Sequence, residues 1–251
     1  MDLKIMKPLQ LVDSWTEDCR IMEKYIRGHA RPDATLQILE AGCGGNWPID
    51  LQGIQFRLTG VDLSEKLLNL RKTRLNDLHD SIVGDLRSVK LEANRFDVIY
   101  NSYVLEHIAG ADHVLENFDR WLKPGGILIL RIPDRNSVWG FVTRVTPQWF
   151  HQFHHKYIRG IRNPDEVKNS PFPTVHDPVV SRQGIYEFCR KNQFTMKEEH
   201  GHTFYLKGLG SVGTLVYMFV RSMNILSLGK LAWRHNDLTY VLEKGGVRNG
   251  Q

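Results

Sequence analysis

Three acidic residues near the ends of successive apolar segments are the side chains best placed for chemistry in this sequence. Glu40 lies within the apolar segment 36–41, and Asp62 and Asp85 close the next two such segments. A glycine-rich turn, 42–45, follows the first of them. Glycine lets backbone N–H groups come close to a ligand, and an acid at the next strand end suits a ribose diol. The pattern predicts a nucleoside site.

Elements that would position these residues follow from the hydrophobic periodicity. Apolar segments and helical patterns alternate along the chain, which is typical of crossover units and a parallel sheet. We expect helices over 9–28, 64–78, 111–122 and 181–191, and strands over 36–41, 56–61, 82–85, 96–100 and 127–132. Two later segments, 194–200 and 238–242, are expected to be antiparallel neighbours near one edge of the sheet.

The composition sets broad limits on the class of protein. Hydrophobic residues make up 41% of the 251 positions, enough for a sizeable core. A formal charge of +5 favours anionic partners without naming one. Three widely spaced cysteines give no disulfide or zinc pattern, and no signal peptide is recognised, so we expect a cytoplasmic protein.

Six short motifs resemble, in their order and spacing, the class I S-adenosylmethionine-dependent methyltransferases. The resemblance runs from about residue 36 to residue 134. Each motif is weak alone, and the ordered set is specific. The motifs are Glu40-Ala-Gly-Cys-Gly-Gly, Val61-Asp-Leu-Ser, Gly84-Asp-Leu, Phe96-Asp-Val-Ile-Tyr-Asn-Ser, Val104-Leu-Glu-His-Ile and Leu122-Lys-Pro-Gly-Gly.

This resemblance, with the alternating pattern, implies an α/β protein: a Rossmann-like, doubly wound, mostly parallel sheet of seven strands with an inserted lid. We expect one domain over residues 1–251. It would comprise an N-terminal helix in 1–30, a substrate lid at 135–180 and a helical insertion at 208–235 before the last strand.

The resemblance also implies a cofactor, S-adenosylmethionine, and the residues that hold it. Its sulfonium and lack of phosphate agree with a site built from carboxylates and without a P-loop lysine. The expected cofactor-binding residues are Gly42 and Gly44 at the methionine end, Glu40 beneath the turn, Asp62 on the ribose, Leu63, Asp85 and Leu86 on the adenine, and Asn101 and Ser102 beside the methyl group.

The segment after the glycine turn departs from the family pattern. Asn46 stands where a further glycine is usual, and Pro48 follows two residues later. Proline is tolerated in the first turn of a helix and not in its interior. We therefore expect the first crossover helix to be shortened.

Histidines are the candidate general bases. An alcohol or phenol that attacks the methyl sulfonium must lose a proton, and histidine titrates near neutral pH. His107 is one candidate, with a packing role as its alternative. In O-methyltransferases of ubiquinone synthesis, a similar Glu-x-x-Glu-His stretch resembles a metal site. Here Tyr103 stands in the first position of that pattern, so no metal is expected. The lid histidines His151, His154 and His155 are the others, in a segment where 135–168 holds six basic and two acidic residues.

Residues 208–229 form a long apolar segment interrupted only by Arg221. Its apolar positions fall on one helical stripe, with Thr214, Tyr217 and Asn224 elsewhere, which is an amphipathic pattern rather than a membrane span. We expect a helix that packs on the sheet or at a homodimer contact. The alternative is an interfacial helix that brings the enzyme to a lipid-linked substrate at a membrane surface.

The sequence thus predicts an S-adenosylmethionine-dependent methyltransferase that O-methylates a small molecule, natural product or glycan. The basic lid favours an anionic or polyhydroxylated acceptor. Nitrogen or carbon acceptors, including lipid-linked ones, are the nearest alternative. Nucleic acid is not expected, since residues 101–103 lack the Asn/Asp-Pro-Pro-Tyr sequence. A non-catalytic S-adenosylmethionine-binding partner protein and a nicotinamide oxidoreductase are further alternatives.

Overall fold

The computed structural model describes residues 8–145, 174–175, 177–203 and 212–246. Eight strands form one sheet in the order β1-β7-β8-β6-β5-β2-β3-β4, and only β8 runs antiparallel to its neighbours. The strands are β1 (Gln10–Val12), β2 (Leu36–Ala41), β3 (Phe56–Asp62), β4 (Asp80–Val83), β5 (Phe96–Ser102), β6 (Leu122–Pro133), β7 (Phe194–His202) and β8 (Asp237–Lys244).

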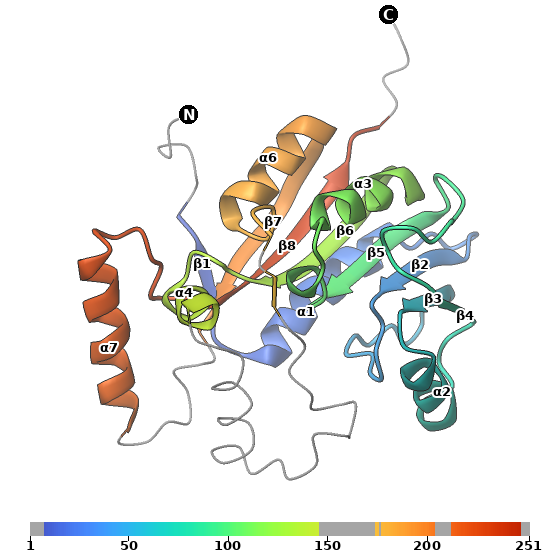
Figure 1. Ribbon diagram of the computed structural model, residues 1–251. Helices are drawn as coiled ribbons and strands as arrows, with labels where there is room; N and C mark the ends of the chain where they lie inside the picture. The colour runs from blue at the N-terminus through green and yellow to red at the C-terminus, as the bar shows by residue number, and fades with distance from the viewer. Residues whose placement is uncertain (1–7, 146–173, 176, 204–211, 247–251) are drawn as a thin grey trace, which may run out of the picture.

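Helices cover both faces of this sheet, as expected for a doubly wound α/β fold (Figure 1). One apolar core lies between the sheet and α3 and α6, and a second lies between the sheet and α1. The helices are α1 (Trp15–His29), α2 (Glu65–Arg74), the short 3-10 helix η2 (Leu105–His107), α3 (Ala111–Trp121), α4 (Val138–Val145), α6 (Arg182–Asn192) and α7 (Val212–Leu226).

The structure corrects two expectations. The sheet has eight strands rather than seven, and the segment from residue 9 begins as a strand rather than as one continuous helix. β1 pairs in parallel with β7, so the N-terminal apolar residues begin as a strand. The Ser14 side chain then accepts a hydrogen bond from the Glu17 N–H and starts α1 at Trp15. A helical stripe hid this boundary because Val12 is buried in the sheet at a spacing that also fits a helix.

The first crossover is shorter than expected. All of residues 42–55 are described, and none of them is helical. Pro48 lies in this stretch and cannot donate a helical hydrogen bond. The chain instead passes Ile49 and Leu51 into the core beside α1 and enters β3 directly. The glycine turn therefore leads into a loop rather than a helix.

The expectation that 208–229 packs on the sheet is wrong for its described part. α7 packs against α4, where the rings of Trp139 and Phe219 lie 6.4 Å apart. It stands at the side of the molecule, beyond the edge of the sheet (Figure 1). Among the described residues, no helix is long and apolar enough to cross a bilayer.

Candidate functional site

The glycine turn after β2 is held in place by its own backbone N–H groups. Those of Gly42 and Cys43 both donate to the Val61 carbonyl. Gly42 and Gly44 have φ angles of +74° and +51°, which L side chains rarely adopt. A Cβ on Gly42 would clash with the Val104 side chain, so no side chain fits there. Asp62 accepts the Gly44 N–H and the Ser64 N–H, each at 2.8 Å. The carboxylate expected to bind ribose is thus already fixed against the turn.

Arg71 of α2 holds the turn from below. Its side chain is fully buried and pairs with Glu40 at 2.7 Å and with Asp77 at 2.9 Å. The guanidinium also donates to the Cys43 carbonyl at 2.8 Å. Burial raises the pKa of Glu40 above its usual range, and the charge of Arg71 opposes that rise. This arrangement explains how a carboxylate can sit beneath the turn, and it assigns a positioning role to Arg71.

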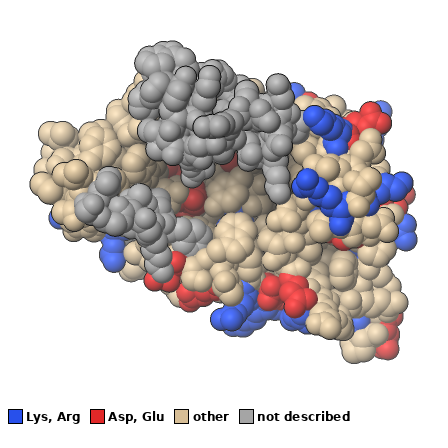
Figure 2. Space-filling view, turned by 90° about the horizontal axis from the view of Figure 1, so that it is seen from below, with Lys and Arg blue, Asp and Glu red and all other residues tan. Residues whose placement is uncertain are grey.

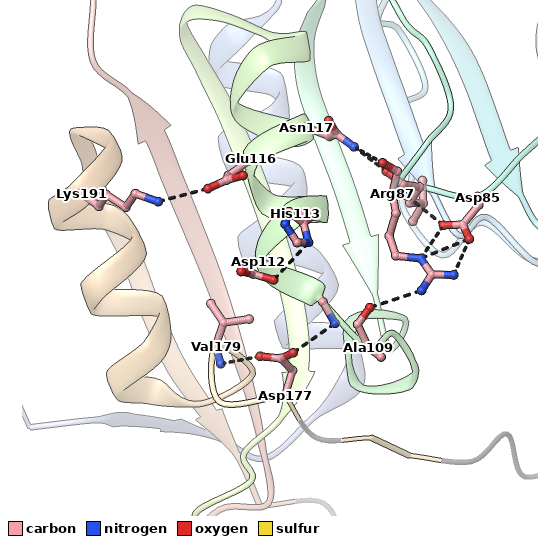
Figure 3. Close-up of polar contacts among 12 residues, drawn as sticks. Asp85, Arg87, Ala109, Asp112, His113, Glu116, Asn117, Asp177, Val179 and Lys191 are labelled. Atoms are coloured by element: carbon pink, nitrogen blue, oxygen red, sulfur yellow. Dashed lines mark hydrogen bonds and ion pairs between the residues drawn. The ribbon is translucent and has the colours of Figure 1, made fainter.

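The expected adenine end carries its own partner. Arg87 forms an ion pair with Asp85, with Nη2 and Oδ2 2.6 Å apart, and reaches the Ala109 carbonyl (Figure 3). Leu86 is buried, whereas Leu63 is 73% exposed beside Asp62. An adenine amine that donates a hydrogen bond to Asp85 would either share the carboxylate with Arg87 or displace the Arg87 guanidinium.

A cavity of about 260 Å³ lies at the methionine end of this crevice. Asn101 does not line this cavity, and its buried side-chain amide donates to the Ala41 carbonyl at 2.8 Å. Ser102 lines the cavity itself, and Trp15 of α1 forms one wall. The remaining lining residues are Glu40, Gly42, Cys43, Gly44, Gly45, Asn46, Pro48 and Tyr100. Four of the expected cofactor residues therefore meet in one cavity: Glu40, Gly42, Gly44 and Ser102.

A buried charged network behind Trp15 was not predicted. Arg131 of β6 lies 3.8 Å from the Trp15 ring centroid and pairs with Asp18 at 2.7 Å. Asp18 also bonds His200 at 2.8 Å, and all three polar side chains are fully buried. Burial raises the pKa of Asp18, but the His200 hydrogen bond and Arg131 together lower it. An arginine inside an otherwise apolar strand was the sequence signal for this network.

Asp18, His200 and His202 lie close enough to share a metal ion, with donor atoms within 4.8 Å of one another. The Asp18 carboxylate is already paired with Arg131, and a divalent cation there would face a buried guanidinium. His202 instead bonds the Thr239 hydroxyl at 2.7 Å. The geometry favours an ion-pair and hydrogen-bond network that connects α1 to β6, β7 and β8.

The 103–107 segment brings acid–base groups to the end of β5. Tyr103 has a φ of +55°, a rare backbone conformation for an aromatic residue. The Glu106 side chain is buried, its Oε2 has no hydrogen-bond partner among the described residues, and burial raises its pKa to about 8. Its other oxygen lies 3.7 Å from Nε2 of His107, whose side chain is 28% exposed. Burial also raises the pKa of Asp237 to about 6, although the charge of Arg131 and a hydrogen bond from Tyr103 lower it.

The other predicted bases are placed only in part. His151, His154 and His155 lie outside the described residues. Asp177 accepts the Gly110 N–H at 3.2 Å and the Val179 N–H, so it joins the start of α3 to the loop before α6 (Figure 3). A larger hollow of about 710 Å³ near it shares no lining residue with the cofactor cavity. Figure 2 shows the hollowed face seen from below, with acidic atoms inside the depression.

The comparisons with known proteins point to one family. A family model described as a methyltransferase domain matches residues 39–130. A ubiquinone biosynthesis O-methyltransferase of Rhizobium leguminosarum is 25% identical over 182 residues, covering 68% of this chain and 70% of the relative. These matches support a class I S-adenosylmethionine-dependent methyltransferase. The predicted family, enzyme class and cofactor are confirmed.

Solved structures agree with this methyltransferase at the level of the fold. An S-adenosylmethionine-dependent methyltransferase of Mesorhizobium loti superposes with a TM-score of 0.52 at 14% identity, covering 88% of this chain and 96% of that one. A phosphoethanolamine N-methyltransferase of Haemonchus contortus, solved with S-adenosyl-L-methionine, gives 0.51 at 14% identity, covering 92% of this chain and 53% of that one. The α/β expectation is therefore confirmed, with the eighth strand as its correction.

The cavity fits the cofactor of a methyltransferase. Its lining combines the backbone of the glycine turn with the carboxyl group of Glu40, and Asp62, the acid expected to bind the ribose diol, is fixed beside the turn through the Gly44 N–H. Bound there, S-adenosylmethionine would supply an electrophilic methyl group at the end of β5. The roles of the individual residues, from Glu40 to Ser102, stay predictions.

Proposed function

We propose that this methyltransferase transfers a methyl group to a hydroxyl oxygen of a small molecule. The observation that carries the proposal is the Glu106–His107 pair at the end of β5, next to the glycine turn that Val104 contacts. The name of the Rhizobium leguminosarum relative, an O-methyltransferase, supports it. An oxygen acceptor needs a nearby base, and an imidazole beside a carboxyl group can serve as one.

The reaction would use this chain's residues to place and deprotonate the acceptor. The acceptor oxygen would form a bond to the methyl carbon as the carbon–sulfur bond breaks, and its proton would pass to His107. Glu106, whose Oε1 lies 3.7 Å from Nε2 of His107, would orient the imidazole ring. Alignment and proximity provide most of the acceleration in such a transfer.

The acceptor side is proposed to lie under the 135–180 lid. The described part of that lid includes α4, and it carries Arg135 and Arg144. These cations are consistent with an anionic or polyhydroxylated acceptor, such as an aromatic acid or a glycan. His151, His154 and His155 stay proposed alternatives to His107 as the base.

The experiment pairs cofactor binding with an acceptor test. S-adenosylhomocysteine and NAD are titrated separately by calorimetry, and product formation from S-adenosylmethionine is followed with 3,4-dihydroxybenzoate and with tyramine. We expect methylation at a catechol oxygen and a large loss of kcat in His107→Gln. Methyl transfer to the tyramine nitrogen would refute the oxygen assignment. Full activity in His107→Gln would instead direct attention to the lid histidines.

A further inference from the structure

The outer face of α7 is apolar and exposed to solvent. Seven of the thirteen exposed large apolar side chains among the described residues lie between residues 215 and 228. Leu215, Leu226 and Leu228 are 67%, 78% and 87% exposed. Leu228 also has a φ of +56°, in a turn that projects it beyond the helix. A patch of this kind marks an interaction surface.

Two polar residues of α7, Arg221 and Asn224, contact the segment that follows the helix, whereas Thr214 and Ser222 are exposed. Asn224 donates to the Leu231 carbonyl at 2.7 Å, and Arg221 lies 4.5 Å from the Trp233 ring centroid. Ser227 accepts the Leu231 N–H at 3.0 Å. The segment after the helix is thus tied to its polar side. A helix on a water-exposed surface has the reverse arrangement, with apolar residues inside.

Charge distinguishes the possible occupants of this face. Residues 135–145 and 212–236 contain no acidic residue, although the whole chain has 28 acids against 33 lysines and arginines. Their five cations are Arg135, Arg144, Arg221, Lys230 and Arg234. A second copy would bring the same cations together, whereas an anionic surface would complement them. Tyr217 and Trp233, in edge contact at 5.5 Å, add the amphipathic rings that suit a lipid interface.

We propose that α7 and the adjoining α4 dock this enzyme on an anionic lipid bilayer, with the outer face of α7 inserted among the headgroups. Figure 2 shows this end of the molecule as an almost continuous surface of uncharged residues. The Val138 N–H donates to the Ala232 carbonyl at 2.8 Å, so the start of α4 is joined to the segment between α7 and β8. The proposal does not depend on which acceptor atom is methylated.

The test is flotation of the full chain with vesicles. Phosphatidylcholine vesicles are compared with vesicles containing about 30% phosphatidylglycerol, at about 0.1 M and about 0.5 M salt. We expect binding to the anionic vesicles, weakened by high salt. Leu226→Glu and Ile225→Glu should each reduce the bound fraction about tenfold, because each places a charge in the inserted face.

Two controls keep the outcome clear. Leu75→Glu adds the same charge at a 46% exposed leucine after α2, far along the chain from α7, and should bind vesicles like the wild type. S-adenosylhomocysteine affinity of every variant reports folding and tests the cofactor site separately. Absence of wild-type binding to anionic vesicles would overturn the proposal. Binding of Leu226→Glu to these vesicles as strong as that of the wild type would also overturn it. The same conclusion would follow if light scattering showed a wild-type dimer that Leu226→Glu converts to a monomer.

Discussion

His202 gives a prediction of how stability depends on pH. Its side chain is fully buried between Thr239 and the Asp18 carboxylate. Burial lowers the pKa of the imidazole from 6.5 to about 4. Because the folded-state pKa lies below the unfolded value, the folded protein binds fewer protons over that interval. Acidification therefore favours the unfolded chain, and the stabilisation that is complete above pH 6.5 is lost toward pH 4.

The size of the effect follows from the shift. Each pKa unit corresponds to about 1.4 kcal/mol, so His202 alone should remove about 2 kcal/mol by pH ~5 and about 3 kcal/mol by pH ~4. Glu106 acts in the opposite direction, because burial raises the pKa of its carboxyl group. The stabilisation that this group gives in its neutral form is lost as pH rises. The difference in unfolding free energy between the wild type and a variant at His202 therefore reports the titration of this histidine alone.

The assay is urea unfolding between pH 4 and pH 8 for wild type and His202→Gln, which cannot titrate. We expect the variant to be less stable at pH ~7 through lost packing, with the deficit shrinking by about 3 kcal/mol toward pH ~4. His113→Asn removes a largely exposed imidazole and serves as the matched control. A constant difference between wild type and His202→Gln across this range would refute a depressed pKa at His202.

Three further predictions concern the cofactor site. Asp62→Ala should weaken S-adenosylhomocysteine binding by about 100-fold or more, as two charge-assisted hydrogen bonds contribute about 1.5–3 kcal/mol each; unchanged calorimetric affinity would exclude a ribose role. Arg71→Met should destabilise the fold by about 3–5 kcal/mol in urea, because it leaves the buried Glu40 carboxylate without its cation, and a wild-type midpoint would contradict this. Arg87→Ala should leave the melting temperature unchanged and modestly tighten cofactor binding by releasing Asp85, so weaker binding would show that Arg87 itself holds the cofactor.

The order of the elements was readable from the sequence because it depends on local periodicity. The strand over 36–41 matches β2 residue for residue, and Ser181 caps α6 as its sequence position indicates. The antiparallel pairing of the last two strands is confirmed as well. Errors fell where two local patterns coincide, as at β1, whose buried Val12 continues the stripe of α1.

The sequence could place the expected cofactor residues near one another, because a glycine turn and strand-end acids meet at one edge of a parallel sheet. It could not predict the side chains that contact these residues. Arg71 is a helix residue like many others, and only the packing of α2 places its guanidinium against Glu40 and the Cys43 carbonyl. The same holds for Arg87 and Asp85, whose pairing depends on side-chain direction.

By itself, the sequence determined most strands of the sheet, the glycine turn and the resemblance to methyltransferases, because each rests on short local motifs. Only the tertiary structure decided which distant charges meet. Asp18, Arg131 and His200 come from three elements, and their burial makes pairing necessary, since an isolated charge in the core costs several kcal/mol. The tertiary structure also turned Arg221 and Asn224 of α7 toward the following segment and its leucines outward, because a helix shows which face is free only once its neighbours are in place.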